Sequence, residues 1–201
     1  MPKSQSKLLK MKRIKLILSL AIFVILPLAL ISCNAKVTVE EIEAALPTLV
    51  DESRALNEIY FGNGFKIDAE RSDVERDGGY FVCDKGSLNI SSVSDLKTAT
   101  EKVFTREYAE VLYSSAFSSA DGARFKDGDG VLMQKAMDLG YFIPLRVYDY
   151  SSVEIEKSKG NRTTVLVKAS ANGDDFETVT LVIVRSGNRG NYSYRLDGPT
   201  Y

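Results

Sequence analysis

The sequence predicts an α+β fold, in which amphipathic helices come first and an antiparallel sheet follows. Two observations carry this prediction. Apolar residues recur at helical spacing soon after the N-terminus of the body, and the C-terminal third consists of strand-length runs separated by Gly- and Asn-containing turns. Helices that precede a run of hairpin-connected strands are typical of α+β domains. We therefore expect N-terminal helices packed on a strongly curved antiparallel sheet.

The first helix is expected to begin at Thr38, because Glu41 three residues later completes a capping box. Pro47 should kink this helix or start a second one at that point. Gly62 and Gly64 should end the helical segment. Its apolar face is made by Ile42, Leu46, Leu49, Leu56 and Ile59.

In the middle of the chain the sequence pattern predicts a loop, a short strand and two short helices. Residues 66–79 are polar and indicate a loop, the run YFVC after it indicates a strand, and DKGS a turn. Ser92 can cap one helix with Asp95 in its first turn, and Thr105 can cap a second. The two helices should therefore meet at Phe104-Thr105.

Strands fill the rest of the chain. Residues 118–134 contain an Asp-Gly turn between apolar runs, which predicts a hairpin. Four further strands are expected within residues 144–158, 162–171, 176–186 and 191–201. Apolar and polar residues alternate in them, as at Val165, Val167 and Ala169, and this pattern favours a sheet with one solvated face.

The N-terminus has the pattern of a secretory signal. Its six basic residues precede an apolar run, Leu16–Ile31, of 16 residues. That run is shorter than the roughly 20 residues needed to span a bilayer. The start is either Met1 or Met11. The stretch Leu30-Ile31-Ser32-Cys33 resembles the bacterial lipobox, and the resemblance implies cleavage before Cys33 and acylation of that cysteine. The alternative is a retained membrane anchor with an incidental cysteine.

Cleavage would divide the chain into a signal peptide (1–32), a lipidated N-terminus with a short linker (33–37) and one domain (38–201). The signal removes six of the 26 basic residues, which leaves 20 against 27 acidic residues and a net charge of −7. An acidic body without a basic cluster argues against nucleic acid as a partner. It favours a solvated surface protein or one that meets a basic partner.

The order of elements resembles the NTF2-like fold, a cone of N-terminal helices and a bent sheet. Two stretches, SVSDLKTATEKVFTREYAEVLY and YRLDGPTY, look like segments of clostridial-type lipoproteins with this fold, although those tend to have Trp where Tyr194 stands. The pattern around Val103 to Ala109 is distantly similar to secreted IseA-type inhibitors of cell-wall DL-endopeptidases. The resemblance implies a Gram-positive cell membrane, an extracytoplasmic location and a possible homodimer. No residue of the inhibitory loop can be carried over.

The residues offer few groups for catalysis. The chain has no His, so Cys-His and Ser-His pairs are excluded. Lipidation of Cys33 would leave Cys83 as the one thiol, in an apolar run where burial is expected. The run DGDG, residues 127–130, lacks the middle ligand of an EF-hand loop and predicts a tight turn. Residues 187–190 predict a hairpin turn, because a phosphate loop needs a Lys-Ser/Thr and a following helix.

Two acidic groups could form sites, but the favoured interpretation is that they are solvated loop faces. They are Asp121, Asp127, Asp129 and Asp138, and Asp174, Asp175 and Glu177. Aromatic residues on a strand mostly serve a core, but in a cone-shaped fold they can line a pocket. We expect the pocket-lining residues to be Tyr141, Phe142, Tyr148 and Tyr150.

These observations favour a non-catalytic, lipid-anchored binding module, without a cofactor or metal, that meets a wall-associated protein or ligand. A narrower alternative is an inhibitor or regulator of a cell-wall hydrolase. A third alternative is an enzyme that uses the cone pocket with an Asp or Tyr as acid/base.

Overall fold

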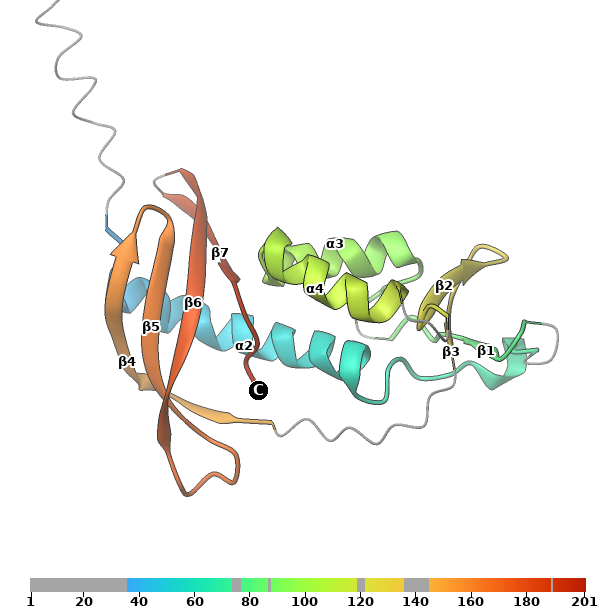
Figure 1. The fold of residues 1–201 in the computed structure, drawn as a ribbon, viewed down its shortest axis with the longest axis horizontal. Helices are drawn as coiled ribbons and strands as arrows, with labels where there is room; N and C mark the ends of the chain where they lie inside the picture. The colour runs from blue at the N-terminus through green and yellow to red at the C-terminus, as the bar shows by residue number, and fades with distance from the viewer. Residues whose placement is uncertain (1–35, 74–76, 87, 119–121, 136–144, 189) are drawn as a thin grey trace, which may run out of the picture. The chain divides into compact units, whose positions relative to one another are not determined.

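The computed structural model describes residues 36–73, 77–86, 88–118, 122–135, 145–188 and 190–201. The chain divides into two units, residues 1–36 and Val37–Tyr201, and every helix and strand below belongs to the second. Three α-helices and seven strands follow one another within this described part of the chain (Figure 1).

Helix α2, Val39–Phe61, begins as predicted. Its N-cap Thr38 and Glu41 form both bonds of a capping box, at 3.3 and 3.2 Å. Pro47 lies inside the helix without ending it, so the alternative of a second helix starting there is wrong. The apolar side chains on either side of Pro47 bury into one core, which offsets the lost backbone hydrogen bond. Gly62 is the C-cap, as expected.

Helices α3, Val93–Val103, and α4, Arg106–Phe117, confirm the predicted pair. Ser92 accepts a hydrogen bond from the backbone N–H of Asp95, at 3.0 Å, and Thr105 caps α4 in the same way. The predicted loop before them contains one 3₁₀ turn, η1, at Ala69–Arg71.

A small antiparallel sheet is formed by β1, Tyr80–Val82, β2, Phe125–Gly128, and β3, Val131–Lys135, in the order β1-β3-β2. The predicted β2–β3 hairpin and its turn are confirmed. Asp129 and Gly130 both have positive φ, 49° and 74°, which is the backbone of the mirror-image turns that join twisted strands.

The larger sheet is an antiparallel meander, β4-β5-β6-β7. Its strands are Val147–Lys159, Arg162–Ser170, Glu177–Asn188 and Asn191–Leu196. All four predicted strands are present. Strand β6 continues two residues beyond the predicted limit, because Gly187 and Asn188 pair with Tyr192 and Asn191 across the hairpin.

The α+β prediction is confirmed, whereas the NTF2-like cone is not. The described strands form two separate sheets, and neither closes or curls strongly. The strands of the smaller sheet pair with one another and not with the meander. Strand β3 bonds to β2 through a two-residue turn and to β1 on its other edge, so these strands do not extend the meander.

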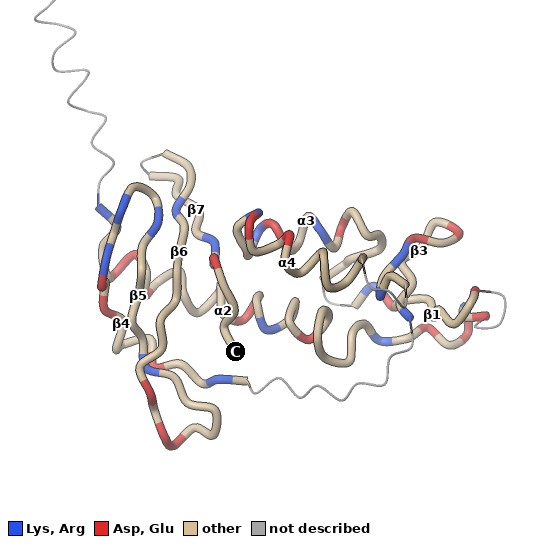
Figure 2. The backbone as a smooth tube through the Cα atoms, viewed as in Figure 1, with Lys and Arg blue, Asp and Glu red and all other residues tan. Residues whose placement is uncertain are grey.

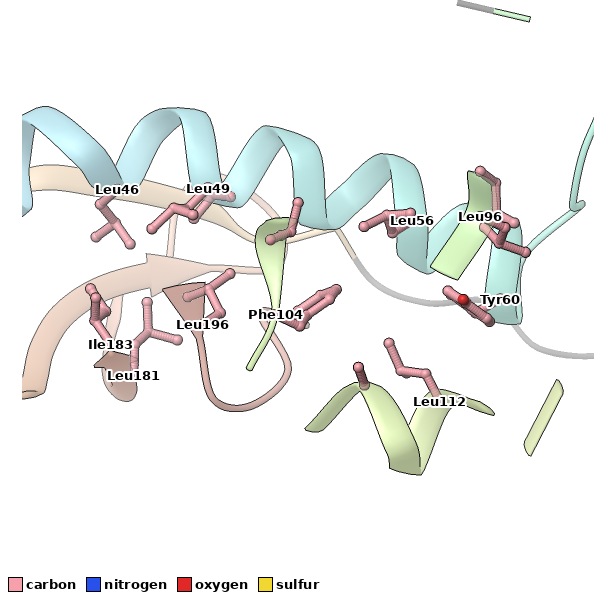
Figure 3. Packing of buried hydrophobic residues seen from close by; sticks show 14 of the residues in the cluster. Leu46, Leu49, Leu56, Tyr60, Leu96, Phe104, Leu112, Leu181, Ile183 and Leu196 are labelled. Atoms are coloured by element: carbon pink, nitrogen blue, oxygen red, sulfur yellow. The ribbon is translucent and has the colours of Figure 1, made fainter. Parts of the chain in front are cut away.

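The core lies along α2, which contacts β4 and β7 of the larger sheet and also α3. Leu46 and Leu49 face Leu181, Ile183 and Leu196, while the other end of α2 faces α3 and α4 (Figure 3). Phe104, at the junction of α3 and α4, is fully buried and is bridged to Leu196 of β7. Each such side chain contributes about 1.5–3 kcal/mol by burial.

Candidate functional site

Two of the four predicted pocket residues lie side by side on β4. Tyr148 is buried and Tyr150 is half-buried, and their rings stack with centroids 6.1 Å apart and an interplanar angle of 8°. The other two, Tyr141 and Phe142, lie outside the described residues, as does the predicted lipidation site Cys33. The aromatic site therefore consists, in the described chain, of the Tyr148–Tyr150 stack.

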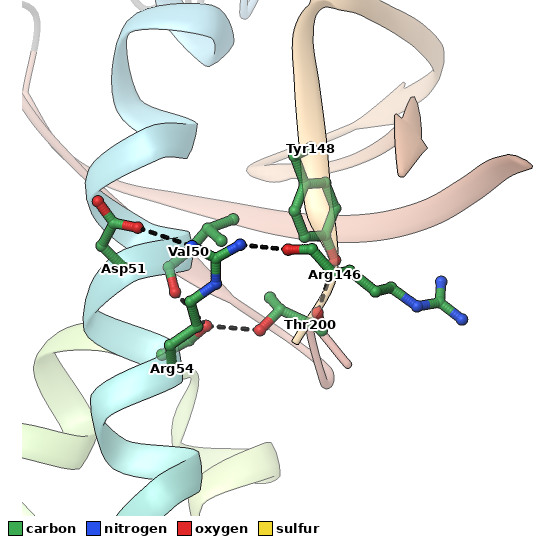
Figure 4. Close-up of polar contacts among 7 residues, drawn as sticks. Val50, Asp51, Arg54, Arg146, Tyr148 and Thr200 are labelled. Carbon is green, nitrogen blue, oxygen red and sulfur yellow. Dashed lines mark hydrogen bonds and ion pairs between the residues drawn. The ribbon is translucent and has the colours of Figure 1, made fainter. Parts of the chain in front are cut away.

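The stack is attached to α2 through the C-terminus of the chain. The Tyr148 hydroxyl donates to the Thr200 carbonyl at 2.7 Å, and the Thr200 hydroxyl lies 2.6 Å from Ser53 Oγ (Figure 4). The Ser53 hydroxyl already donates to the Val50 carbonyl, so its oxygen accepts from Thr200. Because all these groups are buried, the contacts hold the Tyr148 ring in one position.

Arg54 makes a second connection between α2 and β4. Its guanidinium donates to the Arg146 carbonyl, just before β4, and to Asp51 Oδ1 at 3.3 Å (Figure 4). Asp51 is exposed and Arg54 half-buried, and the charges of both act on Tyr150. One carboxylate and one guanidinium therefore lie near enough to Tyr150 for their charges to act on it.

Both tyrosines of the stack stay protonated at neutral pH. Burial raises the pKa of Tyr148 and of Tyr150, against the opposing effect of the nearby Arg54 charge. The stack can therefore offer an aromatic face and a hydroxyl donor, but it does not supply a phenolate base.

Ser53, Arg54 and Thr200 were missed by the sequence analysis. Ser53 had a signal that could have found it: it occupies a buried position of α2 in phase with Leu46, Leu49 and Leu56. A polar residue on an apolar helix face needs a buried partner. Nothing in the sequence indicates that this partner is Thr200, 147 residues away.

A second buried polar cluster holds the C-terminal end of α2. The Arg124 guanidinium donates to the carbonyls of Tyr60 and Gly62, at 2.8 and 2.7 Å. The Gln134 amide bonds to both the N–H and the C=O of Phe65, at 2.8 and 2.7 Å. Burial lowers the pKa of Arg124. These side chains satisfy backbone groups that a helix end and a loop leave open.

Cys83 is buried, as predicted. It lies in an isolated bridge with Ile67, next to β1, and burial raises the pKa of its thiol to about 12. A thiol with that pKa stays protonated at neutral pH, and the thiolate is the reactive form. The described thiol therefore has the character of a core residue.

One residue of each acidic group, Asp127 and Glu177, makes a structural contact. Asp127 accepts a hydrogen bond from the Val93 N–H at 2.8 Å and so adds a cap to α3. Glu177 forms an ion pair with Arg146 at 3.2 Å. Asp121 and Asp138 lie outside the described residues. Within the described ranges no three His, Cys, Asp or Glu side chains come together in a metal-binding group.

No helix in the part of the chain that the structure describes is long and apolar enough to cross a membrane. Comparisons of the chain with protein-family models, with curated proteins and with solved structures gave no match.

Proposed function

We propose that this chain is a non-catalytic binding module, held through a lipidated Cys33 at the outer face of a bacterial cytoplasmic membrane. The tether is supported by the basic N-terminus, the short apolar run and the lipobox-like stretch before Cys33. Two or more acyl chains would give stable anchoring, whereas one gives marginal binding.

The Tyr148–Tyr150 stack carries the binding part of the proposal. Tyr148 is fixed by its hydrogen bond to Thr200, and Tyr150 lies parallel to it with part of its ring exposed. A rigid tyrosine offers a large amphipathic contact surface at a low cost in conformational entropy. Asp51 and Arg54 beside it can orient a polar ligand.

Buried polar side chains form structural hydrogen bonds, and this observation supports a non-catalytic role. Ser53, Thr105, Arg124, Gln134 and Thr200 each hydrogen-bond to main chain or to a neighbouring buried side chain within the described structure. The pKa values of Tyr60 and Cys83 rise to about 12 and the pKa of Asp95 falls below its usual value, so these three groups move away from neutrality. Acid/base catalysts have the opposite tendency.

Affinity capture from cell-envelope extract tests the binding surface. Immobilised residues 34–201 should retain an envelope component, and Tyr150→Ala should lose it. Val111→Ala is the matched control, because Val111 is an exposed apolar residue on α4, 61% accessible and on another element. Equal retention by all three proteins, or retention by none, would contradict the proposal.

The anchor has its own test. Cys33→Ser should abolish acylation and leave an unprocessed precursor in the cell, because the thiol is the acylated group. Mass spectrometry of the N-terminal peptide measures both changes. Normal processing of the variant would refute the lipidated tether.

A second candidate is an inhibitor of a cell-wall hydrolase, favoured by the shape of the β5–β6 loop. Asn172 Oδ1 accepts hydrogen bonds from the backbone N–H groups of Asp174 and Asp175, both at 3.0 Å, and these two carboxylates are exposed. A preformed acidic loop could enter a basic cleft. Purified residues 34–201 should then slow peptidoglycan hydrolysis by a DL-endopeptidase, and Asp174→Asn with Asp175→Asn should relieve it. Unchanged hydrolysis at excess protein would exclude this candidate.

The NTF2-like relationship and a homodimer through the open sheet face also stay proposals. The order of α2, the α3–α4 pair and a four-stranded meander supports the relationship. Crystallography of residues 34–201 that finds β4–β7 wrapped around α2 would establish the cone, and light scattering of residues 34–201 would measure the oligomeric state.

A further inference from the structure

Charge is unevenly distributed along the larger sheet. Residues 157–173 and residues 178–196 contain no Asp or Glu, although the chain after Cys33 has a net charge of −7. Their basic residues are Lys157, Lys159, Arg162, Lys168, Arg185, Arg189 and Arg195, of which Arg189 lies outside the described residues. Figure 2 shows most of these positions toward the β4–β5 and β6–β7 hairpins, while Asp and Glu occupy the β5–β6 loop.

The basic hairpins lie at the N-terminal end of α2. Arg185 of β6 faces Glu41, in the first turn of α2, with Nη1 and Oε2 3.7 Å apart. The backbone N–H of Arg185 donates to the carbonyl of Asn161 at 2.8 Å, so the β4–β5 turn is at the same level. One end of the domain therefore combines this turn, the start of the β6–β7 hairpin and the first turn of α2.

Exposed lysine and arginine side chains flank the β4–β5 turn at this end. Lys159 and Arg162 are a register pair that flanks the two turn residues, and both are exposed, as is Lys157. Arg162 also pairs with Asp197, and Arg185 with Glu41. The opposing carboxylates are Glu154 and Glu156 of β4 and Glu40 and Glu43 of α2. Glu156 lies three residues before Lys159, about 10 Å further back along the strand.

The proposed tether brings this same end to the bilayer. Three residues, 34–36, lie between Cys33 and Val37, which begins the compact unit, and the four Cα–Cα steps from Cys33 to Val37 span at most about 14 Å. That reach is comparable to the roughly 8–10 Å over which charges act at physiological ionic strength. The remaining surface of an acidic domain is repelled by an anionic membrane, whereas exposed lysines and arginines are attracted.

We propose that the β4–β5 hairpin end, formed by Lys157, Lys159 and Arg162, docks on anionic phospholipid head groups and orients the tethered domain. The proposal rests on the membrane tether of the proposed function. Docking through this end points the acidic β5–β6 loop away from the bilayer, toward wall-side partners.

Chemical tethering tests the orientation directly. Residues 33–201, which contain the whole compact unit, are coupled through the Cys33 thiol to a maleimide lipid; Cys83 is buried and does not compete. The vesicles contain phosphatidylcholine alone or with phosphatidylglycerol. Acetylation rates of individual lysines are then followed by mass spectrometry. We expect severalfold protection of Lys157 and Lys159 on anionic vesicles, reversed by high salt, with Lys66 and Lys102 unchanged.

Equal acetylation of Lys157 and Lys159 on both kinds of vesicle would overturn the proposal. Glu40→Gln with Glu43→Gln should increase their protection, and Arg162→Gln should decrease it, because these changes alter the charge of the docking end. Lys168→Gln is the matched control on the same sheet and should leave the protection unchanged. Coupling is chemical, so failure here rejects the docking end, whereas normal processing of Cys33→Ser rejects the tether.

Discussion

The hydroxyl of Tyr148 donates a hydrogen bond to the main-chain carbonyl of Thr200, with the two oxygens 2.7 Å apart. Both residues are buried, and 52 positions of sequence separate them. This bond joins the start of the sheet to the last residues of the chain, and through Ser53 to α2. The C-terminal residues are thereby part of the packed domain.

Tyr148→Phe should reduce the free energy of unfolding by about 1–3 kcal/mol, because a buried carbonyl then loses its donor. Urea unfolding of residues 34–201 measures the change. Tyr150→Phe is the matched control on the same strand, with a half-buried ring, and should stay within about 0.5 kcal/mol of the parent. Equal losses of unfolding free energy in the two variants would show that the hydrogen bond to Thr200 does not stabilise the domain.

Arg124→Met should destabilise the domain by about 3 kcal/mol. The substitution keeps an apolar chain of similar reach but removes both hydrogen bonds from a charged donor to the carbonyls of Tyr60 and Gly62. Thermal and urea unfolding both report the change. Arg106→Met provides the comparison, since Arg106 on α4 is 82% exposed and its loss should cost almost nothing. A stable Arg124→Met protein would mean that water replaces the guanidinium at the helix end.

Gly64→Ala should cost more than the roughly 1–2 kcal/mol expected for a left-handed backbone alone. Gly64 has φ of +76°, and an added Cβ would collide with Gln134 Oε1, which holds the Phe65 N–H. Gly78→Ala isolates the backbone cost, because Gly78 has φ of +68° and open space around it. If the two variants lose the same stability in urea unfolding, Gln134 moves aside freely.

Cys83 should resist alkylation in the folded protein. Its pKa of about 12 lies three units above the ordinary value of 9.0, so at pH 8 the thiolate is about a thousandfold scarcer than in the unfolded chain. Iodoacetamide labelling of Cys33→Ser, followed by mass spectrometry with and without urea, measures the ratio. Because the folded-state pKa is raised, this thiol contributes stability that is complete below pH 9 and is lost as pH rises from 9 toward 12. Rapid labelling without urea would contradict the burial of Cys83.

Local signals predicted most of the elements. Thr38 with Glu41, Ser92 with Asp95, and Thr105 located three helix starts, because N-caps depend on neighbouring residues only. The Asp-Gly and Gly-Asn turns located the hairpins for the same reason. The predicted alternative of a second helix starting at Pro47 was wrong, because the buried residues on both sides of the proline outweigh its local preference to end a helix.

Long-range relations were not predictable in the same way. A strongly curved sheet was expected from the order of elements and its resemblance to the NTF2-like fold, whereas the described strands form two sheets, one of which consists of β1, β3 and β2. In the candidate site, too, the long-range partners were not predictable from the sequence. Tyr148 and Tyr150 were found from their aromatic character, while their partner Thr200 and the flanking Arg54 emerged only from tertiary contacts.

The sequence by itself determined the helix starts, the hairpin turns, the α+β order and the acidic charge after Cys33, because each depends on composition or on residues a few positions apart. Only the tertiary structure decided which strands share a sheet, where buried polar groups find partners and which hairpins lie beside the start of α2. Those relations arise from packing between distant segments, where burial of apolar surface and satisfaction of polar groups select one arrangement among many.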